Sequence, residues 1–555
     1  MVADPYRWLE DPDSVETKEW VREQNERTRD FLAGDARRQK IKDNLTRLIN
    51  YPRYSVPMKE GDYYYFHYND GLQNQPVFYR SKQLDGSEKE VVLDPNQMNE
   101  AGTAALTNLK FSQDGSKLAY GVSFDGSDWQ EIKMKDLKTG EDYPEVLQWC
   151  KFTGIAWTKD ERGFYYSRYP AQDSESSQES NFHNKIYYHK VGTPQDEDKL
   201  IYEKPEEKEL SFTPTISDDN RYLILTVNNG TEPKTGIYYR DLESDDSSFT
   251  TLVKEREDDY AILGNEGPLF YFYTNRNAPK GRIIAIDIQH PEKENWQEII
   301  PEQGDTISFV DIFDHSLVVT TMHHAYEKLA IYSLDGELRK QVPLPDFISI
   351  IDIAGKKTDS EMFLNYTSFL DPSRINRYDF EADKLEMIFE EGLATGEASE
   401  FETKQIFYTS KDGTKVPMFI THKKGIELTG DHPVLLFGYG GYNISLTPSY
   451  SPITKMWLEA GGIYAMPNLR GGGEFGEKWH LDGILDKKQN VFDDFIAAAE
   501  WLIDHNYTNP SRLAIMGGSN GGLLVGASIT QRPELFGAAL CLVPVTDMLR
   551  FHKFH

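Results

Sequence analysis

The chain has 555 residues, of which 39% are hydrophobic and 13% aromatic, so it can bury large cores and is too long for one ordinary domain. Its 90 acidic and 60 basic residues give a formal net charge of -30, which disfavours nucleic acid and anionic membranes as partners. Two cysteines, Cys150 and Cys541, cannot form a disulfide framework, and no signal peptide, membrane-spanning run or Cys/His metal pattern is visible. We therefore expect a soluble cytoplasmic monomer without a metal site.

The first fifty residues differ in pattern from those that follow. Apolar residues recur at helical spacing among charges between residues 12 and 50, which predicts a helical arm. From about Tyr51 to about residue 400, this pattern gives way to short runs rich in Tyr, Val, Ile and Phe, separated by Asp-Gly and similar turns. These runs predict a large domain built from β-strands.

The strand-like runs repeat along the chain. One kind is a turn followed by an apolar strand, at EGDYYYFHY, DGSKLAYGV, ERGFYYSRY, DDNRYLILTV, EGPLFYFYT, DHSLVVTTM and DSEMFLNYT. A second kind follows each copy, at PVFYRSKQLDG, EIKMKDLKTG, KIYYHKVG, GIYYRDLES, RIIAIDIQ, KLAIYSLDG and INRYDFEAD. Seven paired copies, with a period of roughly 45 to 57 residues, predict a seven-bladed β-propeller rather than a β-sandwich.

After about residue 400, strand and helix patterns alternate. TKVPMFITHK, HPVLLFGYGG, GGIYAMPNLRGGG, RLAIM and GAALCLVPV are strand-like, and GLLVGASIT is helix-like. A helix with an apolar stripe from Phe492 to Ile503 is expected to have Asn490 as its N-cap. The alternation predicts a doubly wound α/β sheet. We therefore divide the chain into a helical arm of the catalytic domain (1–50), the propeller (51–400) and a partial catalytic domain (401–555).

The stretch GGSNGG, residues 517 to 522, contains the pattern Gly-x-Ser-x-Gly. The strand-like RLAIM leads into it and a helix leaves it, which is the setting of a nucleophile elbow. In such a turn Gly517 and Gly521 must lack bulk, and Gly518 and Gly522 relieve the turn further. Ser519 is therefore a candidate nucleophile near a helix N-terminus. The alternative is a glycine-rich turn that only packs a helix closely on a strand.

Two groups are candidates for an oxyanion hole. One is the backbone N–H of Asn520, the residue after the nucleophile, and the other belongs to the loop after an earlier strand. That loop is the stretch FGYGGY, residues 437 to 442. The Tyr439 phenol could donate a hydrogen bond to an oxyanion, or the ring could simply pack over the glycines.

The partners of Ser519 are harder to find in the sequence. Hydrolases of this fold place the triad in the order Ser, Asp or Glu, His, yet only Glu534, Asp547, His552 and His555 follow the serine. A compact triad of Asp547 with one of these histidines is one interpretation. The other is that the catalytic Asp and His are absent from this chain, whose α/β sheet is then incomplete at its C-terminus.

Several long stretches resemble one family. The stretches GYGGYNISLTPSY, NLRGGGEFGEKWH, KKQNVFDDF and GGSNGGLL are similar to those of the prolyl oligopeptidases, cytosolic serine peptidases, and so are DPYRWLEDPDS, INYPRYS, GLQNQPVFYR, GSDW and FHKFH. The resemblance covers essentially the whole chain. It implies an α/β-hydrolase domain with an inserted seven-bladed propeller, in a chain truncated at both ends and mainly at the C-terminus.

The resemblance also implies residue roles. Ser519 becomes the nucleophile, and the Tyr439 hydroxyl and the Asn520 N–H form the oxyanion hole. The residues implied around a proline pocket are Tyr442, Asn520 and Val545, and Phe152 of the propeller is implied to reach the substrate from above. Tyr442 stands where the family usually has Phe, and Asn228 stands where the family often has a substrate-binding arginine.

The function that follows is a serine endopeptidase that cleaves short proline-containing peptides on the carboxyl side of proline through an acyl-enzyme, without a cofactor. Three alternatives stay open at this point. They are a related oligopeptidase or exopeptidase, an ester hydrolase on the same elbow, and a catalytically inactive propeller scaffold.

Overall fold

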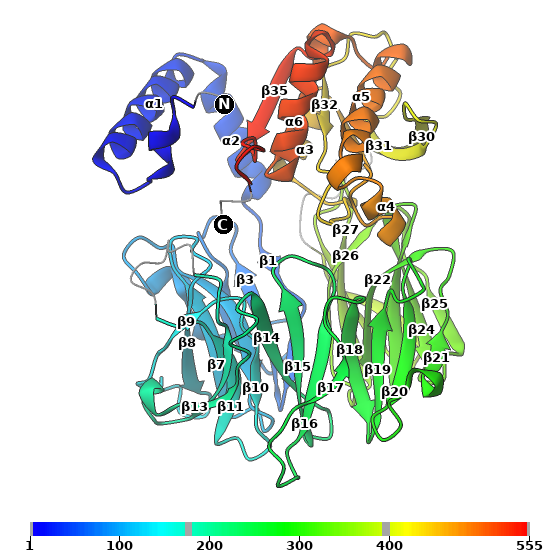
Figure 1. Ribbon diagram of the computed structural model, residues 1–555. Helices are drawn as coiled ribbons and strands as arrows, with labels where there is room; N and C mark the ends of the chain where they lie inside the picture. Colours follow the sequence, from blue (N-terminus) through cyan, green and yellow to red (C-terminus); the bar gives the residue numbers. More distant parts are fainter. Residues whose placement is uncertain (1–3, 172–179, 391–399, 552–555) are drawn as a thin grey trace.

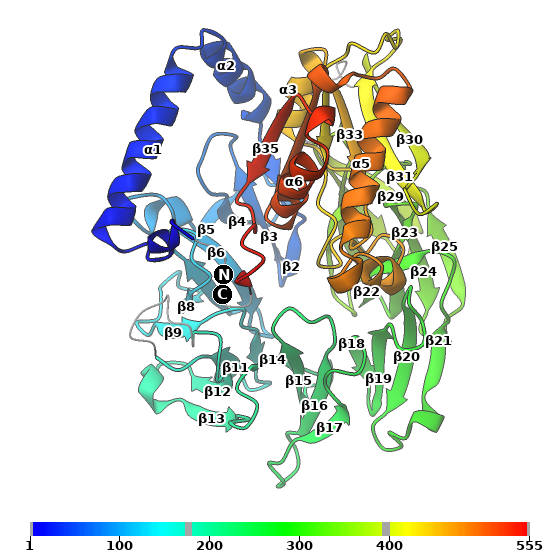
Figure 2. The same cartoon turned by 45° about the horizontal axis from the view of Figure 1, so that its top comes forward.

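The computed structural model describes residues 4–171, 180–390 and 400–551. A ring of β-sheets fills the lower part of Figure 1, and a smaller α/β unit, coloured yellow to red, lies above it. The helices near the N-terminus, coloured blue, lie beside that α/β unit (Figures 1 and 2).

The ring contains seven sheets of antiparallel strands that follow one another in chain order. The first three contain β1–β5 (Arg53–Tyr54, Met58–Glu60, Tyr63–Asn69, Val77–Ser81, Glu90–Leu93), β6–β9 (Ala105–Phe111, Lys117–Ser123, Gln130–Asp136, Leu147–Cys150) and β10–β13 (Ile155–Trp157, Gly163–Arg168, Lys185–Lys190, Lys199–Tyr202). The other four contain β14–β17 (Leu210–Ile216, Tyr222–Asn229, Gly236–Asp241, Thr250–Val253), β18–β21 (Tyr260–Glu266, Leu269–Thr274, Arg282–Asp287, Gln297–Ile300), β22–β25 (Thr306–Phe313, Ser316–His323, Tyr326–Ser333, Leu338–Val342) and β26–β29 (Ser349–Gly355, Glu361–Thr367, Arg374–Asp379, Lys384–Glu390). The prediction of a seven-bladed propeller is confirmed.

The two repeated sequence patterns correspond to the two middle strands of each blade. The first pattern forms β3, β7, β11, β15, β19, β23 and β27, and the second forms the strand after each of these. Middle strands are the most buried, and every residue of β27 is buried. Outer strands such as β13 are short and partly exposed, so they leave a weaker apolar signal.

The ring closes through side chains between the first and last blades, which share no sheet. Val56, Phe363 and Ile375 form one buried cluster across this junction. Two ion pairs flank the cluster, with N–O distances of 3.0 Å for Lys59 and Glu361 and 2.7 Å for Lys356 and Glu60. Among the described residues, closure therefore depends on packing and on charged pairs rather than on backbone hydrogen bonds.

The α/β unit is built on a six-stranded sheet with the order β30-β31-β33-β32-β34-β35. Its strands are β30 (Phe401–Thr409), β31 (Lys415–Lys423), β32 (Val434–Phe437), β33 (Ile463–Pro467), β34 (Leu513–Gly518) and β35 (Ala538–Leu542). The pairs from β33 through β32 and β34 to β35 are parallel, and the pairs that join β30, β31 and β33 are antiparallel. The predicted α/β-hydrolase sheet is thus observed, and β35 is its exposed edge.

Helices cover both faces of this sheet. On one face, Met418 and Ile420 of β31 pack with α5 (Gln489–Asp504) and α6 (Asn520–Gln531). On the other face, Phe419 packs with α3 (Pro452–Glu459) and with aromatic residues of the propeller. The alternation of Met418, Phe419 and Ile420 between the two faces follows from the two-residue period of a strand. α4 (Glu477–Leu481) lies at the end of the unit nearest the propeller (Figure 1).

The N-terminal arm is two helices, α1 (Val15–Ala33) and α2 (Arg37–Ile49), rather than one continuous helical stretch. The chain breaks between them at Gly34, which caps α1. α2 docks on α3 through Arg47 and Glu459, whose charged atoms lie 2.6 Å apart. Within the described part of the chain, no helix has both the length and the apolar character needed to cross a membrane.

Residues of the last two blades form an apolar junction with the α/β unit. Phe369 and Tyr326 from the propeller share a buried cluster with Phe419 and Tyr464 of the catalytic sheet. Hydrogen bonds from Ser349 Oγ to Pro448 O (2.7 Å) and from Tyr450 N to Thr367 Oγ1 (3.2 Å) accompany this cluster. The propeller is therefore attached to the face of the sheet opposite α5 and α6.

Candidate active site

The candidate site lies where two neighbouring parallel strands end. β32 pairs with β34, and Phe437 lies opposite Met516 at the carboxyl end of the pair. The glycine-rich loop after β32 and the elbow after β34 therefore leave the sheet side by side, joined by the Gly438 N–H donating to Met516 O (3.1 Å). Ligand sites of open α/β sheets form at this edge.

Ser519 has the backbone of a nucleophile elbow. Its φ of 56° and ψ of -117° lie outside the ordinary regions for a residue with a side chain, and α6 begins at the next residue. A Cβ at Gly517 would clash with Gly521 O, and one at Gly521 would lie 2.6 Å from Gly438 O. A Cβ at Gly518 would make only ordinary contact, at 3.7 Å from Leu542 Cβ. The turn therefore needs Gly517 and Gly521, and the expectation that Gly518 also relieves it is wrong.

The structure brings Tyr439 and Asn520 together. The buried Asn520 is the first residue of α6, and its Nδ2 donates a hydrogen bond of 2.7 Å to Tyr439 O. A Cβ at Gly441 would lie 2.5 Å from Asn520 Nδ2, so glycine at this position makes room for the amide. Both proposed oxyanion donors thus sit on segments that contact each other directly.

Lys488 is a member of this group that the sequence reasoning missed. Its Nζ donates to Gly440 O at 2.7 Å and to Asn520 Oδ1 at 3.0 Å. Burial lowers the pKa of the Lys488 ammonium to about 8. The sequence predicted Asn490 as the N-cap of α5, but the helix begins after Lys488. The Asn490 side chain donates a hydrogen bond to Asp482 O at 2.9 Å. The sequence signal of Lys488 is only a lysine in the run KKQN.

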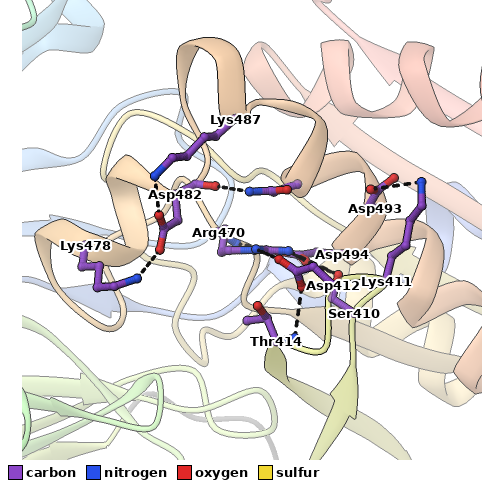
Figure 3. A network of polar contacts seen from close by, with 11 residues as sticks. Ser410, Lys411, Asp412, Thr414, Arg470, Lys478, Asp482, Lys487, Asp493 and Asp494 are labelled. Atoms are coloured by element: carbon purple, nitrogen blue, oxygen red, sulfur yellow. Dashed lines mark hydrogen bonds and ion pairs between the residues drawn. The ribbon is translucent and has the colours of Figure 1, made fainter.

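Beside these loops lies a buried ion pair, shown in Figure 3. Arg470 donates from Nη2 to Asp494 Oδ1 (2.6 Å) and from its backbone N–H to Asp494 Oδ2 (3.1 Å). It also pairs with Asp412, and this hydrogen bond lowers the pKa of the Asp412 carboxyl to about 2. Since a Cβ at Gly440 would lie 3.3 Å from Arg470 O, the network sits directly against the glycine-rich loop.

The three side chains predicted to contact substrate occupy different places. The Val545 N–H lies 3.4 Å from Ser519 O, so this residue is at the elbow. Tyr442 is in the glycine-rich loop, exposed, with a φ of 55°. Phe152 is in the propeller between β9 and β10, 67% exposed, with a φ of 50°. The role of each in substrate binding stays a prediction.

The alternative triad of Asp547 with His552 or His555 stays a prediction. Asp547 is exposed and its carboxylate lies with those of Asp4 and Glu10, each within 4.8 Å of the others. His552 and His555 lie outside the described residues. In the parts of the chain that the structure describes, no side chain hydrogen-bonds to Ser519 Oγ.

Comparisons with known proteins agree over the length of the chain. The sequence pattern of the prolyl oligopeptidase N-terminal β-propeller domain matches residues 1–391, and that of the prolyl oligopeptidase family matches residues 448–555. A prolyl endopeptidase of Elizabethkingia miricola is 39% identical over all of this chain and 78% of its own length. A dual function macrocyclase-peptidase of Galerina marginata is 36% identical over all of this chain and 80% of its own.

Solved structures give the same result. A prolyl endopeptidase from a study of inter-domain dynamics matches 99% of this chain and 81% of its own, with 34% identity and a TM-score of 0.94. A Galerina marginata prolyl oligopeptidase bound to a macrocyclization substrate matches all of this chain and 80% of its own, with 36% identity and a TM-score of 0.93. The apo form, 35% identical over all of this chain and 81% of its own, has a TM-score of only 0.77. This chain therefore superposes more closely on the substrate-bound Galerina marginata structure than on its apo form.

Proposed function

The chain belongs to the prolyl oligopeptidase family and is a serine-type peptidase that acts at proline; from this premise we propose that Ser519 is its nucleophile. The single observation that carries this role is the backbone at Ser519, a strained residue between a buried parallel strand and a helix N-terminus. Such a turn holds a hydroxyl out at the edge of the sheet, where a peptide carbonyl can approach it.

The chemistry is acyl transfer. Ser519 Oγ attacks the carbonyl carbon of the proline residue, and its proton passes to a histidine that an aspartate orients. The carbonyl oxygen gains negative charge and accepts hydrogen bonds from the Asn520 N–H and the Tyr439 hydroxyl. The C–N bond then breaks, the amine leaves with the proton, and water later hydrolyses the acyl-enzyme. Substrate-bound Galerina marginata structures were solved for variants in which a serine, an aspartate or a histidine is replaced by alanine, which supports a triad of these types.

Proline suits an apolar site, because its ring is apolar and it has no N–H to satisfy. We assign Tyr442, Val545 and, from the propeller, Phe152 to its surroundings. The propeller covers the catalytic unit (Figure 1), so we expect short peptides to be preferred over folded proteins.

We also propose that the enzyme works as a monomer in the cytoplasm. Cys150 and Cys541 are both free, and Cys150 is buried, which suits a reducing compartment. The formal charge of -30 supports the absence of nucleic-acid and membrane partners. The division into an arm (1–50), a propeller (51–400) and a catalytic domain (401–555) is proposed on the same basis.

Cleavage of reporter peptides tests the specificity. The full-length enzyme is expected to release a fluorophore from a blocked Gly-Pro amide and not from a matched Arg-Arg amide. A preference for Arg-Arg would indicate an oligopeptidase of different specificity, and turnover of esters without peptides would indicate an ester hydrolase. Either result would contradict the proposed function.

A further inference from the structure

Lys488 stands apart among the charged residues of the catalytic unit. Its ammonium is partly buried, and its two hydrogen-bond acceptors are a backbone carbonyl, Gly440 O, and a neutral amide oxygen, Asn520 Oδ1. Lysines on the surface of the same segment pair with carboxylates instead, as Lys487 does with Asp482 (Figure 3). Removing an ammonium from water without a carboxylate partner is unfavourable. The burial of Lys488 must therefore be offset by a contribution to stability or to activity.

Helix stability does not supply that contribution. Lys488 is the N-cap residue of α5, and its side chain makes no capping hydrogen bond. A cation at a helix N-terminus meets the positive end of the helix dipole, so a lysine is disfavoured there.

Three hydrogen bonds connect Lys488 to both halves of the oxyanion hole. Its Nζ contacts Gly440 O (2.7 Å), one residue after Tyr439, and Asn520 Oδ1 (3.0 Å). Asn520 Nδ2 in turn donates to Tyr439 O (2.7 Å). The Asn520 amide therefore uses its oxygen toward the ammonium and its nitrogen toward the loop, a division that matches the donors and acceptors present.

The loop that carries Tyr439 needs such an anchor. It continues into Gly440, with a φ of 64°, and Gly441, and glycine gives a chain more backbone freedom than any other residue. The hydroxyl of Tyr439 and the N–H of Asn520 must converge on one oxygen atom, and oxyanion stabilisation depends on donors held in place before the reaction.

We propose that Lys488 is a positioning residue that fixes the loop of Tyr439 against the first turn of α6 and so sets the geometry of the oxyanion hole. This inference rests on the proposed function, because it assigns Lys488 to the transition state of that reaction. It predicts that losing the ammonium lowers kcat and leaves KM almost unchanged, since the ground-state substrate does not need the oxyanion donors.

The ammonium also gives the inference a pH signature. Charged groups on the surrounding elements have other partners: Asp493 pairs with Lys411, Asp494 with Arg470, and the His480 ring contacts Gly471 O. Burial alone places the pKa of Lys488 at about 8. Because the charged form makes the stronger hydrogen bonds, kcat should fall as pH rises through about 8.

The test compares Lys488→Met with Lys487→Met in the full-length enzyme, using a Gly-Pro amide substrate. Lys488→Met should lower kcat on the order of 10- to 100-fold, change KM by less than about threefold, and lose the decline of kcat above pH 8. The control, whose lysine only pairs with Asp482 at the surface, should keep wild-type kcat and the wild-type pH profile. Lys488→Arg keeps the charge and should restore much of kcat without the decline.

Asn520→Ala gives a second route that leaves Lys488 in place. It removes both side-chain contacts and keeps the backbone N–H, so it should lower kcat by a similar factor. The double variant Lys488→Met/Asn520→Ala should have about the same kcat as the more impaired of the two single variants, because both substitutions act through one contact. Wild-type kcat in Lys488→Met, or fully multiplicative effects in the double variant, would overturn the inference while the proposed function stands. A wild-type enzyme that fails to cleave the Gly-Pro amide would overturn both.

Discussion

The propeller and the catalytic sheet differ in how they bury their strands. Each propeller blade packs between two neighbours, and the ring closes where the first blade meets the last. In the catalytic sheet, β34 leads directly to Ser519 and pairs with β32 and β35. The propeller spreads its stability over seven similar units, whereas the site depends on a few glycines and polar atoms at one edge. Substitutions in the propeller should therefore mainly lower stability, whereas substitutions at the site edge of the catalytic sheet should mainly lower activity.

The largest effect is expected at the oxyanion hole. Tyr439→Phe removes one hydroxyl donor and keeps the ring, so kcat should fall on the order of 100- to 1,000-fold with an unchanged fold. Tyr6→Phe, at an exposed tyrosine of the N-terminal arm, is the control and should change kcat by less than about threefold. Steady-state kinetics on a Gly-Pro amide measure both, and equal kcat values for the two variants would contradict the assignment of Tyr439.

The elbow offers a comparison between two neighbouring glycines. Gly521→Ala places a Cβ 2.6 Å from Gly438 O, whereas Gly518→Ala finds its nearest atom at 3.7 Å. Gly521→Ala should therefore displace α6 and lower kcat/KM by at least about tenfold, because small misplacements of catalytic groups are costly. Gly518→Ala should stay within about twofold of the wild type, and similar losses in both variants would show that the turn is not as described.

Ring closure tests the propeller side of the comparison. Phe363 is 1% exposed and packs with Val56 and Ile375 between the first and last blades. Phe363→Ala should leave a cavity and so lower the free energy of unfolding, measured by chemical denaturation, by about 3 to 5 kcal/mol. At 25 °C its kcat should match that of the wild type, with Phe363→Leu as a milder control. A loss of kcat without a loss of stability would contradict this separation.

The smallest effect is expected where the two regions meet. Burial and the negative charge of Glu477 raise the pKa of Asp259 from 3.8 to about 6. A carboxyl whose folded pKa is raised destabilises the folded state as pH increases from about 4 to 6. Asp259→Asn should therefore raise the free energy of unfolding at pH 7 by up to about 3 kcal/mol, at about 1.4 kcal/mol per pKa unit, and leave it unchanged at pH 4. An equal shift at both pH values would contradict the electrostatic cause.

The sequence predicted the middle strands of the blades well, because period-two apolar runs between turns are strong signals. The inner and outer strands give a weaker signal where they are short or partly exposed, as in β13, so the sequence does not locate them individually. Ser519 could be predicted because a strand, a turn and a helix meet within a few residues. Lys488 could not, because its partners lie 48 and 32 residues away and no local pattern marks a partly buried cation. The start of α5 was also predicted wrongly, because the Asn490 side chain donates to Asp482 O, eight residues earlier, instead of capping the helix.

Active-site labelling tests the central role of Ser519 most directly. The full-length enzyme, treated with a fluorophosphonate and digested, should carry the phosphonyl group on the peptide that contains Ser519, in step with loss of Gly-Pro amidase activity. Ser519→Ala should take up no label at that peptide and lose activity on the order of 10,000-fold or more. An active enzyme that is not labelled at Ser519, or a Ser519→Ala variant that retains turnover, would contradict the account.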